Sequence, residues 1–252
     1  MPKRLIFFVF FFLFIIFSYF IYYQTTNSST EIIDFAMDTP LRVKVEGPNS
    51  AAYAKMAVAE IKRLDKLFNR FDPNSEVSRL NCGEKFKPSK EIIAVLSLAE
   101  RMRQVSFGAF NVRYNGKIDL GGIGKGYAVE LARRLLVKKG AKGGIIDTHS
   151  SIAVWGPRVW KIGIQDPEDK SKLFTVVELQ NGQALSTSGN YERGKHIIDP
   201  RTHKAAAECK SVTLIGWDAG ELDALSTAVF VLGPIKGKKL IKNMSEIKVI
   251  II

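Results

Sequence analysis

A glycine-rich segment, Asp119-Leu-Gly-Gly-Ile-Gly-Lys-Gly126, combines residue types whose spacing suggests chemistry. It lies between a short predicted strand, Ile118–Leu120, and a predicted helix, Lys125–Lys139. Glycines let backbone N–H groups approach an anion closely, and a helix N-terminus adds partial positive charge beside the full charge of Lys125. The spacing matches neither Walker A nor G-x-G-x-x-G. The segment is therefore a candidate phosphate or pyrophosphate cradle, although such a turn can equally be structural.

A second candidate is Asp223-Ala-Leu-Ser-Thr227, which lies in a predicted helix. Residues four apart share one helix face, so the Asp223 carboxylate and the Thr227 hydroxyl would point the same way. Both are hard oxygen ligands. Mg²⁺ suits such a sparse site because it keeps waters and takes substrate phosphates as ligands. The alternative is a solvated aspartate beside a threonine that packs within the helix.

A third candidate joins Thr187-Ser188-Gly189-Asn190-Tyr191 to the following segment, His196–Thr202. Hydroxyls, a histidine and a carboxylate are expected there across two tight turns. His196 could act as a general base or as an orienting hydrogen-bond donor. The alternative is a loop histidine that satisfies backbone carbonyls. Nothing marks a nucleophile elbow, so the sequence supports no Ser-His-Asp triad.

The elements that must position these residues follow from hydrophobic periodicity and capping signals. Helices are expected from Ser50 to about Phe68, from Ser89 to about Val105, over Lys125–Lys139 with Gly140 closing it, and from Asp218 to Gly233-Pro234. Strands are expected at Leu41–Val45, Ile118–Leu120, near Ile145, and at Ile152–Trp155, Trp160–Ile164, Phe174–Leu179, Ser211–Ile215 and Ile247–Ile252, while Asn69–Asn81 is expected to be a polar loop and Gly108–Lys117 a turn-rich connection.

Helices and strands alternate irregularly along the chain, which favours the α+β class over a doubly wound sheet. About 220 residues follow the N-terminal segment, enough for one sizeable core or two intimate lobes. We expect a domain at 31–252, behind a short polar linker at 24–30.

The N-terminal segment Leu5–Tyr23 runs nineteen residues without a charge, behind Lys3 and Arg4. That length is about enough to cross a bilayer as a helix, and positive charge tends to stay cytoplasmic. Residues 1–23 are therefore expected to be an uncleaved single-pass anchor in the inner (cytoplasmic) membrane, with the domain on the periplasmic side. The alternative is a cleaved signal peptide.

The chain carries a formal net charge of +12, of which Lys3 and Arg4 supply two. Such a surface favours anionic ligands and acidic partners. No basic-aromatic array of the RNA-binding type occurs, so nucleic acid is not an expected partner. Cys82 and Cys209 could form a disulfide in an oxidising compartment, although two free thiols are favoured. The three histidines lack zinc-site spacing.

Taken together and in order, these segments resemble the ApbE family of FAD:protein FMN transferases. The resemblance covers nearly all of 31–252. Its strength lies in the number and colinearity of the motifs, each of them modest. The matching stretches are Met37–Thr39, Phe71–Asn81, Gly108–Phe110, Ile118–Val129, Trp160–Pro167, Ala184–Tyr191, His196–Thr202, Ser211–Thr213 and Leu222–Gly233.

The resemblance implies a Mg²⁺-dependent transfer of FMN from FAD to a Thr or Ser hydroxyl of an exported or membrane-bound redox protein, with release of AMP. It implies metal ligands at Asp223, Thr227 and a backbone carbonyl of the Gly121–Gly124 loop, for which we take Gly124. His196 and Lys125 would serve the reacting phosphates. Positions implied to bind FAD are Met37, Asp72, Asp119, Gly121, Gly122, Lys125, Ser188 and Gly189.

Three stretches depart from the family pattern. Met37-Asp38-Thr39 stands where the family has Met-Gly-Thr, Asp147-Thr-His-Ser-Ser151 replaces a stretch with a glycine pair, and only Asn111–Lys117 stands where most members have a long segment. Two alternatives to the transferase therefore remain open. One is an FAD pyrophosphatase that yields FMN and AMP, and the other is a flavin-binding protein without turnover.

Overall fold

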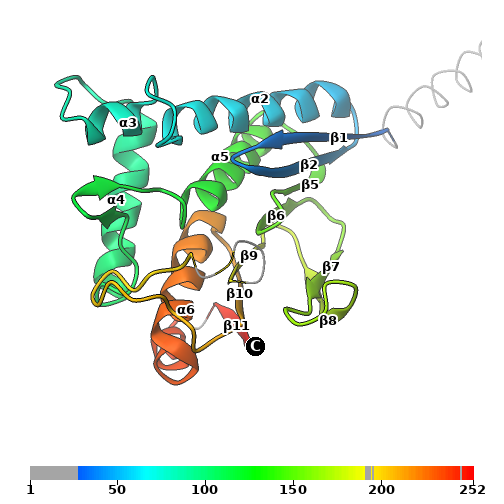
Figure 1. The fold of residues 1–252 in the computed structure, drawn as a ribbon. Coiled ribbons are helices and arrows are strands. Elements are labelled where there is room, and N and C mark those ends of the chain that lie inside the picture. Colours follow the sequence, from blue (N-terminus) through cyan, green and yellow to red (C-terminus); the bar gives the residue numbers. More distant parts are fainter. Residues whose placement is uncertain (1–27, 191–193, 195, 245) are drawn as a thin grey trace, which may run out of the picture.

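The computed structural model describes residues 28–190, 194, 196–244 and 246–252. One antiparallel sheet of seven strands runs through it in the order β1-β2-β5-β6-β9-β10-β11 (Figure 1). The strands are β1 Ser29–Ala36, β2 Thr39–Glu46, β5 Gly143–Asp147, β6 Ser151–Trp155, β9 Ala184–Gly189, β10 Ser211–Gly216 and β11 Lys248–Ile251.

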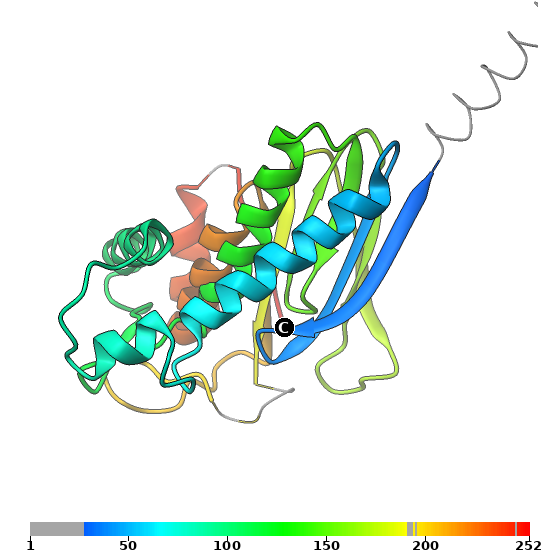
Figure 2. The same ribbon diagram turned by 90° about the horizontal axis from the view of Figure 1, so that it is seen from above.

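Helices cover one face of this sheet. α2 (Ser50–Phe68), α5 (Gly124–Lys138) and α6 (Ala219–Lys242) pack against the strands, and α4 (Lys90–Val105) lies outside them against α6 and α2 (Figure 2). Their buried apolar positions form the main core, with Ile61, Leu136 and Phe230 fully inaccessible to solvent. Burial of these faces is the chief stabilising contribution to the helix layer.

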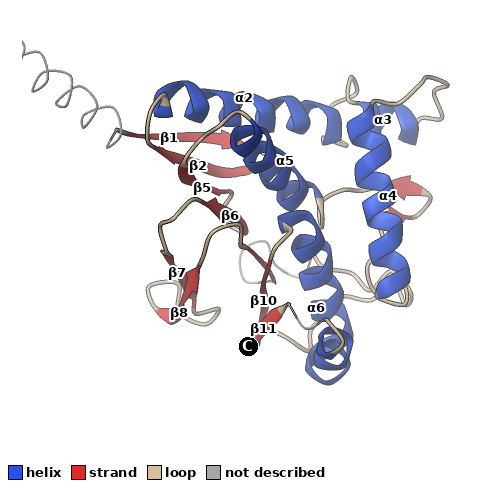
Figure 3. Cartoon of the chain, turned by 180° about the vertical axis from the view of Figure 1, so that it is seen from behind, coloured by secondary structure: helices blue, strands red, loops and turns tan. Residues whose placement is uncertain are grey.

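A separate two-stranded hairpin covers the other face, as Figure 3 shows from behind. It consists of β7 (Trp160–Gln165) and β8 (Leu173–Leu179). A second, smaller core lies between the hairpin and the sheet and includes Ile145, Trp160 and Leu185. The two cores lie on either side of one sheet. The α+β class is confirmed.

Capping predictions were accurate for α4, α5 and α6, whereas Asn49 at the start of α2 makes no side-chain cap hydrogen bond. The side chain of Ser89 accepts the Ile92 N–H at the start of α4, and Asp218 accepts the Glu221 N–H at the start of α6. Gly140, in the left-handed region, ends α5 with its N–H on the Val137 carbonyl. The Asn115-Gly116 turn joins β3 (Arg113–Tyr114) to β4 (Lys117–Ile118) within the expected turn-rich connection.

Several expectations were wrong in detail. The polar loop Asn69–Asn81 contains a short helix, α3 (Glu76–Asn81), because Ser75 caps it by accepting the Ser78 N–H. α6 breaks at Gly233 as expected, but the chain then continues in a helix to Lys242. Pro234 permits this because its fixed φ suits a first helical turn.

Three strands were not predicted, β1, the two-residue β3 and β9. β9 contains Thr187, Ser188 and Gly189, which the sequence had suggested lie in a tight turn. Its residues are small and polar, with weak intrinsic strand preference, and pairing with β6 and β10 fixes their conformation. The correction matters because a strand in the middle of a sheet places these hydroxyls more rigidly than a loop would.

Residues 1–27 lie outside the described part of the chain, and so does the segment Leu5–Tyr23 that we expect to be an anchor. No helix within the described residues is long and apolar enough to span a bilayer. Cys82 is exposed and Cys209 is buried, and both are free thiols.

Candidate active site

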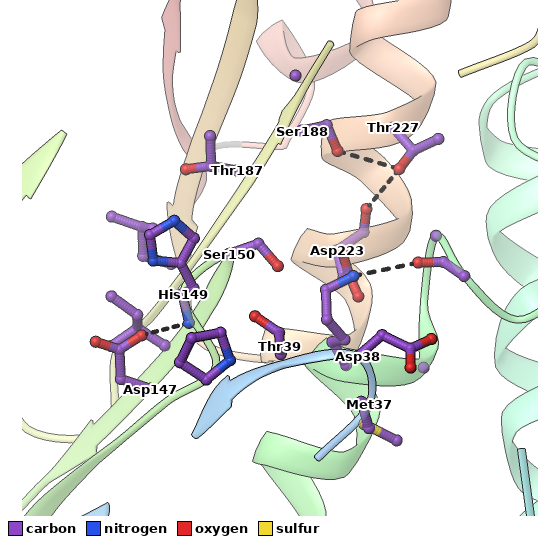
Figure 4. Close-up of a pocket in the computed structure, with 18 of the residues that line it drawn as sticks. Met37, Asp38, Thr39, Asp147, His149, Ser150, Thr187, Ser188, Asp223 and Thr227 are labelled. Carbon is purple, nitrogen blue, oxygen red and sulfur yellow. Dashed lines mark hydrogen bonds between the residues drawn. The ribbon is translucent and has the colours of Figure 1, made fainter. Parts of the chain in front are cut away.

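A large cavity opens at the end of the sheet where the β1–β2 turn, the β5–β6 turn and the N-terminus of α5 meet. It encloses about 1560 Å³ and brings together residues from both halves of the chain. Figure 4 shows side chains from β2, β5, β9 and α6 converging on it. The predicted site residues that line it are Met37, Asp119, Gly121, Gly122, Gly124, Lys125, Ser188, Gly189, His196, Asp223 and Thr227.

Asp223 is the most buried acidic group in the cavity wall, with 3% of its surface exposed. One carboxylate oxygen accepts the Gly126 N–H at 2.9 Å and the other lies 3.3 Å from the Ser186 hydroxyl. Among the described residues, no Lys or Arg pairs with it. Burying a carboxylate without a cation is costly, so this placement is typical of a group that serves a ligand.

The hydroxyl groups around Asp223 form a short chain between β9 and α6. Thr227 Oγ1 donates to the backbone carbonyl of Asp223 at 3.2 Å. The Ser188 hydroxyl lies 3.1 Å from Thr227 Oγ1. Ser188 also lies 2.8 Å from Ser226 Oγ. Figure 4 shows Ser188, Thr227 and Asp223 on the same side of the cavity. Asp223 and Thr227 were predicted to share one face of the helix, and their observed contact is compatible with that prediction.

The glycine-rich loop passes directly beside these hydroxyls. Asp119 orders the loop, because one of its oxygens accepts the Gly121 N–H at 2.9 Å while the other contacts Arg70 at 3.2 Å. A Cβ at Gly122 would lie 3.2 Å from Thr227 Oγ1, so the glycine lets the loop approach α6 closely. Lys125 lies in the first turn of α5, and its Nζ is 3.4 Å from the Gly121 carbonyl oxygen.

The donor set in this corner consists of hard oxygen atoms. No group of three His, Cys, Asp or Glu residues within the described chain could hold a metal unaided. One buried carboxylate, the Thr227 hydroxyl and the backbone carbonyls of the glycine loop suit Mg²⁺, which completes its shell with water and substrate phosphates. Lys125 and the glycine-rich loop line the same cavity.

The β1–β2 turn contributes Met37 from the opposite side of the cavity. Met37 and Asp38 both have positive φ, 56° and 58°, which fits a type I′ hairpin turn between Ala36 and Thr39. Neither residue is a glycine, so the turn is strained, and Asp65 on α2 fixes it by accepting the Met37 N–H at 2.9 Å.

Two predicted residues occupy less central positions. Asp72 does not line the cavity, and its carboxylate accepts the Asn74 N–H in a local turn. His196 lines the cavity with an exposed side chain, and its Nδ1 lies 2.9 Å from the Gly194 carbonyl. A carbonyl can only accept, so Nδ1 carries the hydrogen and Nε2 is left to accept a proton. The roles of both residues stay predictions.

The β5–β6 turn, which the family resemblance singled out only as the place where side chains replace a glycine pair, was not among the predicted site residues. Asp147, His149 and Ser150 all line the cavity (Figure 4). Burial raises the pKa of the Asp147 carboxyl above its ordinary value, while the His149 N–H and the charges of His149 and Arg42 act in the opposite direction. The residue types gave a signal, since three polar side chains follow a buried strand, but their position beside β9 depends on the sheet order.

Ser186 and Asp65 were also missed, because their roles are indirect. Ser186 holds the carboxylate of Asp223, and Asp65 holds the backbone of Met37. The alternation of Ser186 and Ser188 along one strand would have pointed to a shared face, had β9 been recognised as a strand.

The fold and the site together define a class: an α+β domain whose cavity joins a glycine-rich loop to a buried carboxylate and neighbouring hydroxyl groups at the end of an antiparallel sheet. The model of the ApbE family matches residues 37–116 and 112–251. The chain therefore belongs to the ApbE family.

Individual relatives agree with this assignment. The FAD:protein FMN transferase of Escherichia coli (strain K12) is 33% identical over 139 residues, which make up 50% of this chain and 40% of that protein. The chain thus matches less than half the length of that relative. A crystal structure of the ApbE protein from Thermotoga maritima has 27% identity and a TM-score of 0.80, covering 89% of this chain and 94% of that one.

A more distant structure shares the fold. The flavin transferase ApbE from Vibrio cholerae is 19% identical, with a TM-score of 0.75 over 89% of this chain and 93% of that one.

Proposed function

We propose that this chain transfers FMN from FAD to a Thr or Ser hydroxyl of a target protein, with AMP as the leaving group. The single observation that carries the proposal is the buried, cation-free Asp223 beside Thr227 and the glycine-rich loop. The relatives named as FAD:protein FMN transferases support the choice of substrate.

Mg²⁺ bound at Asp223 and Thr227, with the Gly124 carbonyl, would neutralise pyrophosphate charge and so favour displacement. Lys125 and the amides of the glycine-rich loop bind phosphate oxygens. His196 accepts the proton of the incoming hydroxyl at Nε2. Met37, Asp119, Ser188 and Gly189 shape the FAD site, and Asp72 supports the loop beyond Phe71.

Hydrolysis of FAD by water is a second candidate, favoured by one observation. The β3–β4 hairpin beside the cavity has strands of only two residues, and Tyr114 and Phe71 at the cavity wall are 38% and 72% exposed. Water therefore has access to a bound phosphate that a long covering segment would shield.

We also propose that Leu5–Tyr23 tethers the domain to the inner membrane on its periplasmic side. The uncharged length and the preceding Lys3 and Arg4 support this orientation. The acceptor would then be an exported or membrane-bound redox subunit, and FAD would have to reach that compartment.

The test is incubation of the full chain with FAD, Mg²⁺ and a purified redox subunit that carries an exposed Thr, followed by in-gel flavin fluorescence and chromatography of AMP. Transfer predicts covalent flavin on the subunit in equal amount to AMP. Release of AMP without covalent flavin on the subunit would show that the chain hydrolyses FAD and does not transfer FMN. FAD binding without AMP release would contradict both activities and leave a flavin-binding protein.

A further inference from the structure

The described domain begins at one end of the central sheet, beside a loop that carries lysines. The Gly47 N–H donates to the Ser28 carbonyl at 2.7 Å, and the Ser28 hydroxyl donates to the Gly47 carbonyl at 2.6 Å. A Cβ at Gly47 would lie 3.3 Å from the Cβ of Lys142, which precedes β5. The Tyr53 hydroxyl, in the first turn of α2, donates to the Lys139 carbonyl at 2.8 Å. Ser28, Lys139 and Lys142 therefore lie at the same end of the sheet.

This end of the domain is strongly positive. We call it the basic end and define it by three exposed lysines, Lys138, Lys139 and Lys142. None of the three makes an ion pair within the described part of the chain. Glu46, at the end of β2, is paired with Arg158. The loops at this end contain no Asp or Glu, over residues 47–49, 139–142 and 156–159. The positive charge of the three lysines is therefore not balanced locally.

The proposed tether enters the domain at the basic end. Residues 24–27 separate Tyr23 from Ser28, so the chain can span at most about 18 Å between these two residues. The basic end consequently lies close to the surface of the bilayer that the tether occupies. Lysines near an anionic membrane surface strengthen binding by roughly fivefold each. The length of the chain and the charge of the domain thus bring the same surface to the lipid headgroups.

The corner with Asp223 and the glycine-rich loop lies at the other end of the domain. α5 begins in that loop at Gly124 and ends at Lys138 in the basic end, and β1 runs from Ser29–Ala36 toward Met37 in the cavity wall. Figure 2 shows the starts of β1 and α2 side by side and α3 beyond the far end of α2. A helix of the length of α5 spans about 22 Å, so the corner stands roughly 20 Å from the basic end.

We propose that the basic end binds anionic phospholipid headgroups and so holds the Asp223 corner away from the bilayer. The inference rests on the proposed tether, which supplies the proximity, while the lysines supply the orientation. The acceptor hydroxyl must then be presented roughly 20 Å from the membrane surface. A soluble exported protein or a projecting domain of a membrane subunit meets this requirement, whereas a residue at the bilayer surface does not.

The test is resonance energy transfer from a fluorophore on Cys82 of the full chain to labelled lipid headgroups in vesicles. Cys82 is exposed and Cys209 is buried, so one thiol takes the label. Cys82 follows Asn81, whose side chain bonds to the backbone of Ile118 beside the glycine-rich loop, so the label lies at the cavity end. Phosphatidylcholine vesicles that contain phosphatidylglycerol should give low transfer. Pure phosphatidylcholine vesicles should give more, because an undocked domain tilts toward the bilayer.

Two triple variants assign this orientation to the lysines. Lys138→Gln/Lys139→Gln/Lys142→Gln removes three charges and keeps the Cβ and Cγ atoms of Lys142 that lie against Gly47. The matched control, Lys236→Gln/Lys238→Gln/Lys239→Gln, removes three exposed charges from α6, which packs against β10 and β11 at the opposite edge of the sheet from β1. The first variant should weaken docking roughly 10²-fold and show the higher transfer, while the control keeps the wild-type value.

Equal transfer in the two kinds of vesicle would overturn the inference. No rise in the first variant, or an equal rise in both variants, would also overturn it, because the orientation would not depend on the basic end. A full chain that high salt removes from the vesicles contradicts the tether and the inference with it. A chain that docks as expected and never releases AMP from FAD contradicts the proposed catalytic function alone.

Discussion

At the scale of single residues, the cavity is lined by residues with unfavourable backbone conformations and by buried carboxylates. The fold itself does not require either feature. Met37, Asp38 and His149 are non-glycine residues with positive φ, and all three line the cavity. Asp223 is buried without a cation among the described residues, and burial disfavours the charged form of Asp147. Strain and desolvation of this kind persist where they serve binding or catalysis.

Asp147→Asn should stabilise the chain at neutral pH. Burial raises the pKa of Asp147, so the folded state takes up a proton more readily than the unfolded state, and stability falls as pH rises from the unfolded pKa through the folded pKa. Asparagine removes that penalty, and each 1 kcal/mol gained raises Tm by about 2–4 °C in a chain of this size.

Thermal unfolding between pH 3 and pH 8 measures this effect. The gain in Asp147→Asn should be largest at neutral pH and disappear below about pH 4, the ordinary range of an unfolded aspartate. A gain that is constant across this range, or a loss at pH 7, would show that burial of the charge is not the cause. Glu31→Gln is the exposed control.

At the scale of elements, the close contact of α5 and α6 builds the corner of the cavity that contains Asp223, Thr227 and the glycine-rich loop. A Cβ at Gly126 would lie 2.1 Å from the Ala219 carbonyl oxygen and 2.6 Å from Asp223 Cβ. The helices can therefore touch only because residue 126 is a glycine, and this contact lets the Gly126 N–H reach the Asp223 carboxylate. One residue thus sets both the packing and the orientation of the acid.

Gly126→Ala should separate the two helices and cost about 1–3 kcal/mol or more in unfolding free energy. Urea unfolding measures this loss. Gly124→Ala is the matched control on the same helix, because its Cβ would make ordinary contacts of 3.6 Å with Leu120 and 3.7 Å with Phe68. Equal destabilisation of the two variants would contradict the proposed role of the contact.

The helices and the shared helix face of Asp223 and Thr227 could be predicted from the sequence because their signals are local. The caps at Ser89 and Asp218 and the i, i+4 spacing of Asp223 and Thr227 need no knowledge of the sheet. β9 gave no such signal, since Ala184–Gly189 is small and polar and becomes a strand through its neighbours. The place of Asp147 and His149 in the site follows from the same non-local pairing.

At the scale of the whole molecule, a basic domain with an open cavity follows a long uncharged segment. Only residues 28–252, with short gaps, are described, so the tether stays a proposal. Its consequence is spatial: a tethered enzyme acts on acceptors in the same membrane or compartment. The chain's net charge of +12, all but two of which lies in the domain, would also hold the domain near an anionic surface.

The tether predicts that the full chain sediments with membranes and is extracted by detergent. Deletion of residues 1–27 should release the domain into the soluble fraction. A wash with 1 M salt is the control, because it screens surface charge within about 3 Å and removes a merely basic protein. Release of the full chain by salt alone would contradict the anchor. A mature chain that lacks the N-terminal segment would show that the segment is a cleaved signal peptide.

The central claim is that FAD is cleaved in the corner formed by Asp223, Thr227 and the glycine-rich loop. The most direct measurement is AMP release from FAD with Mg²⁺ by the wild-type chain, Asp223→Asn and Glu221→Gln. Glu221 lies on the same helix and pairs with Arg101 at the surface. Asp223→Asn should lose roughly 10²–10³-fold in rate while Glu221→Gln keeps it, and EDTA should abolish release. AMP release by Asp223→Asn at the wild-type rate would contradict the account.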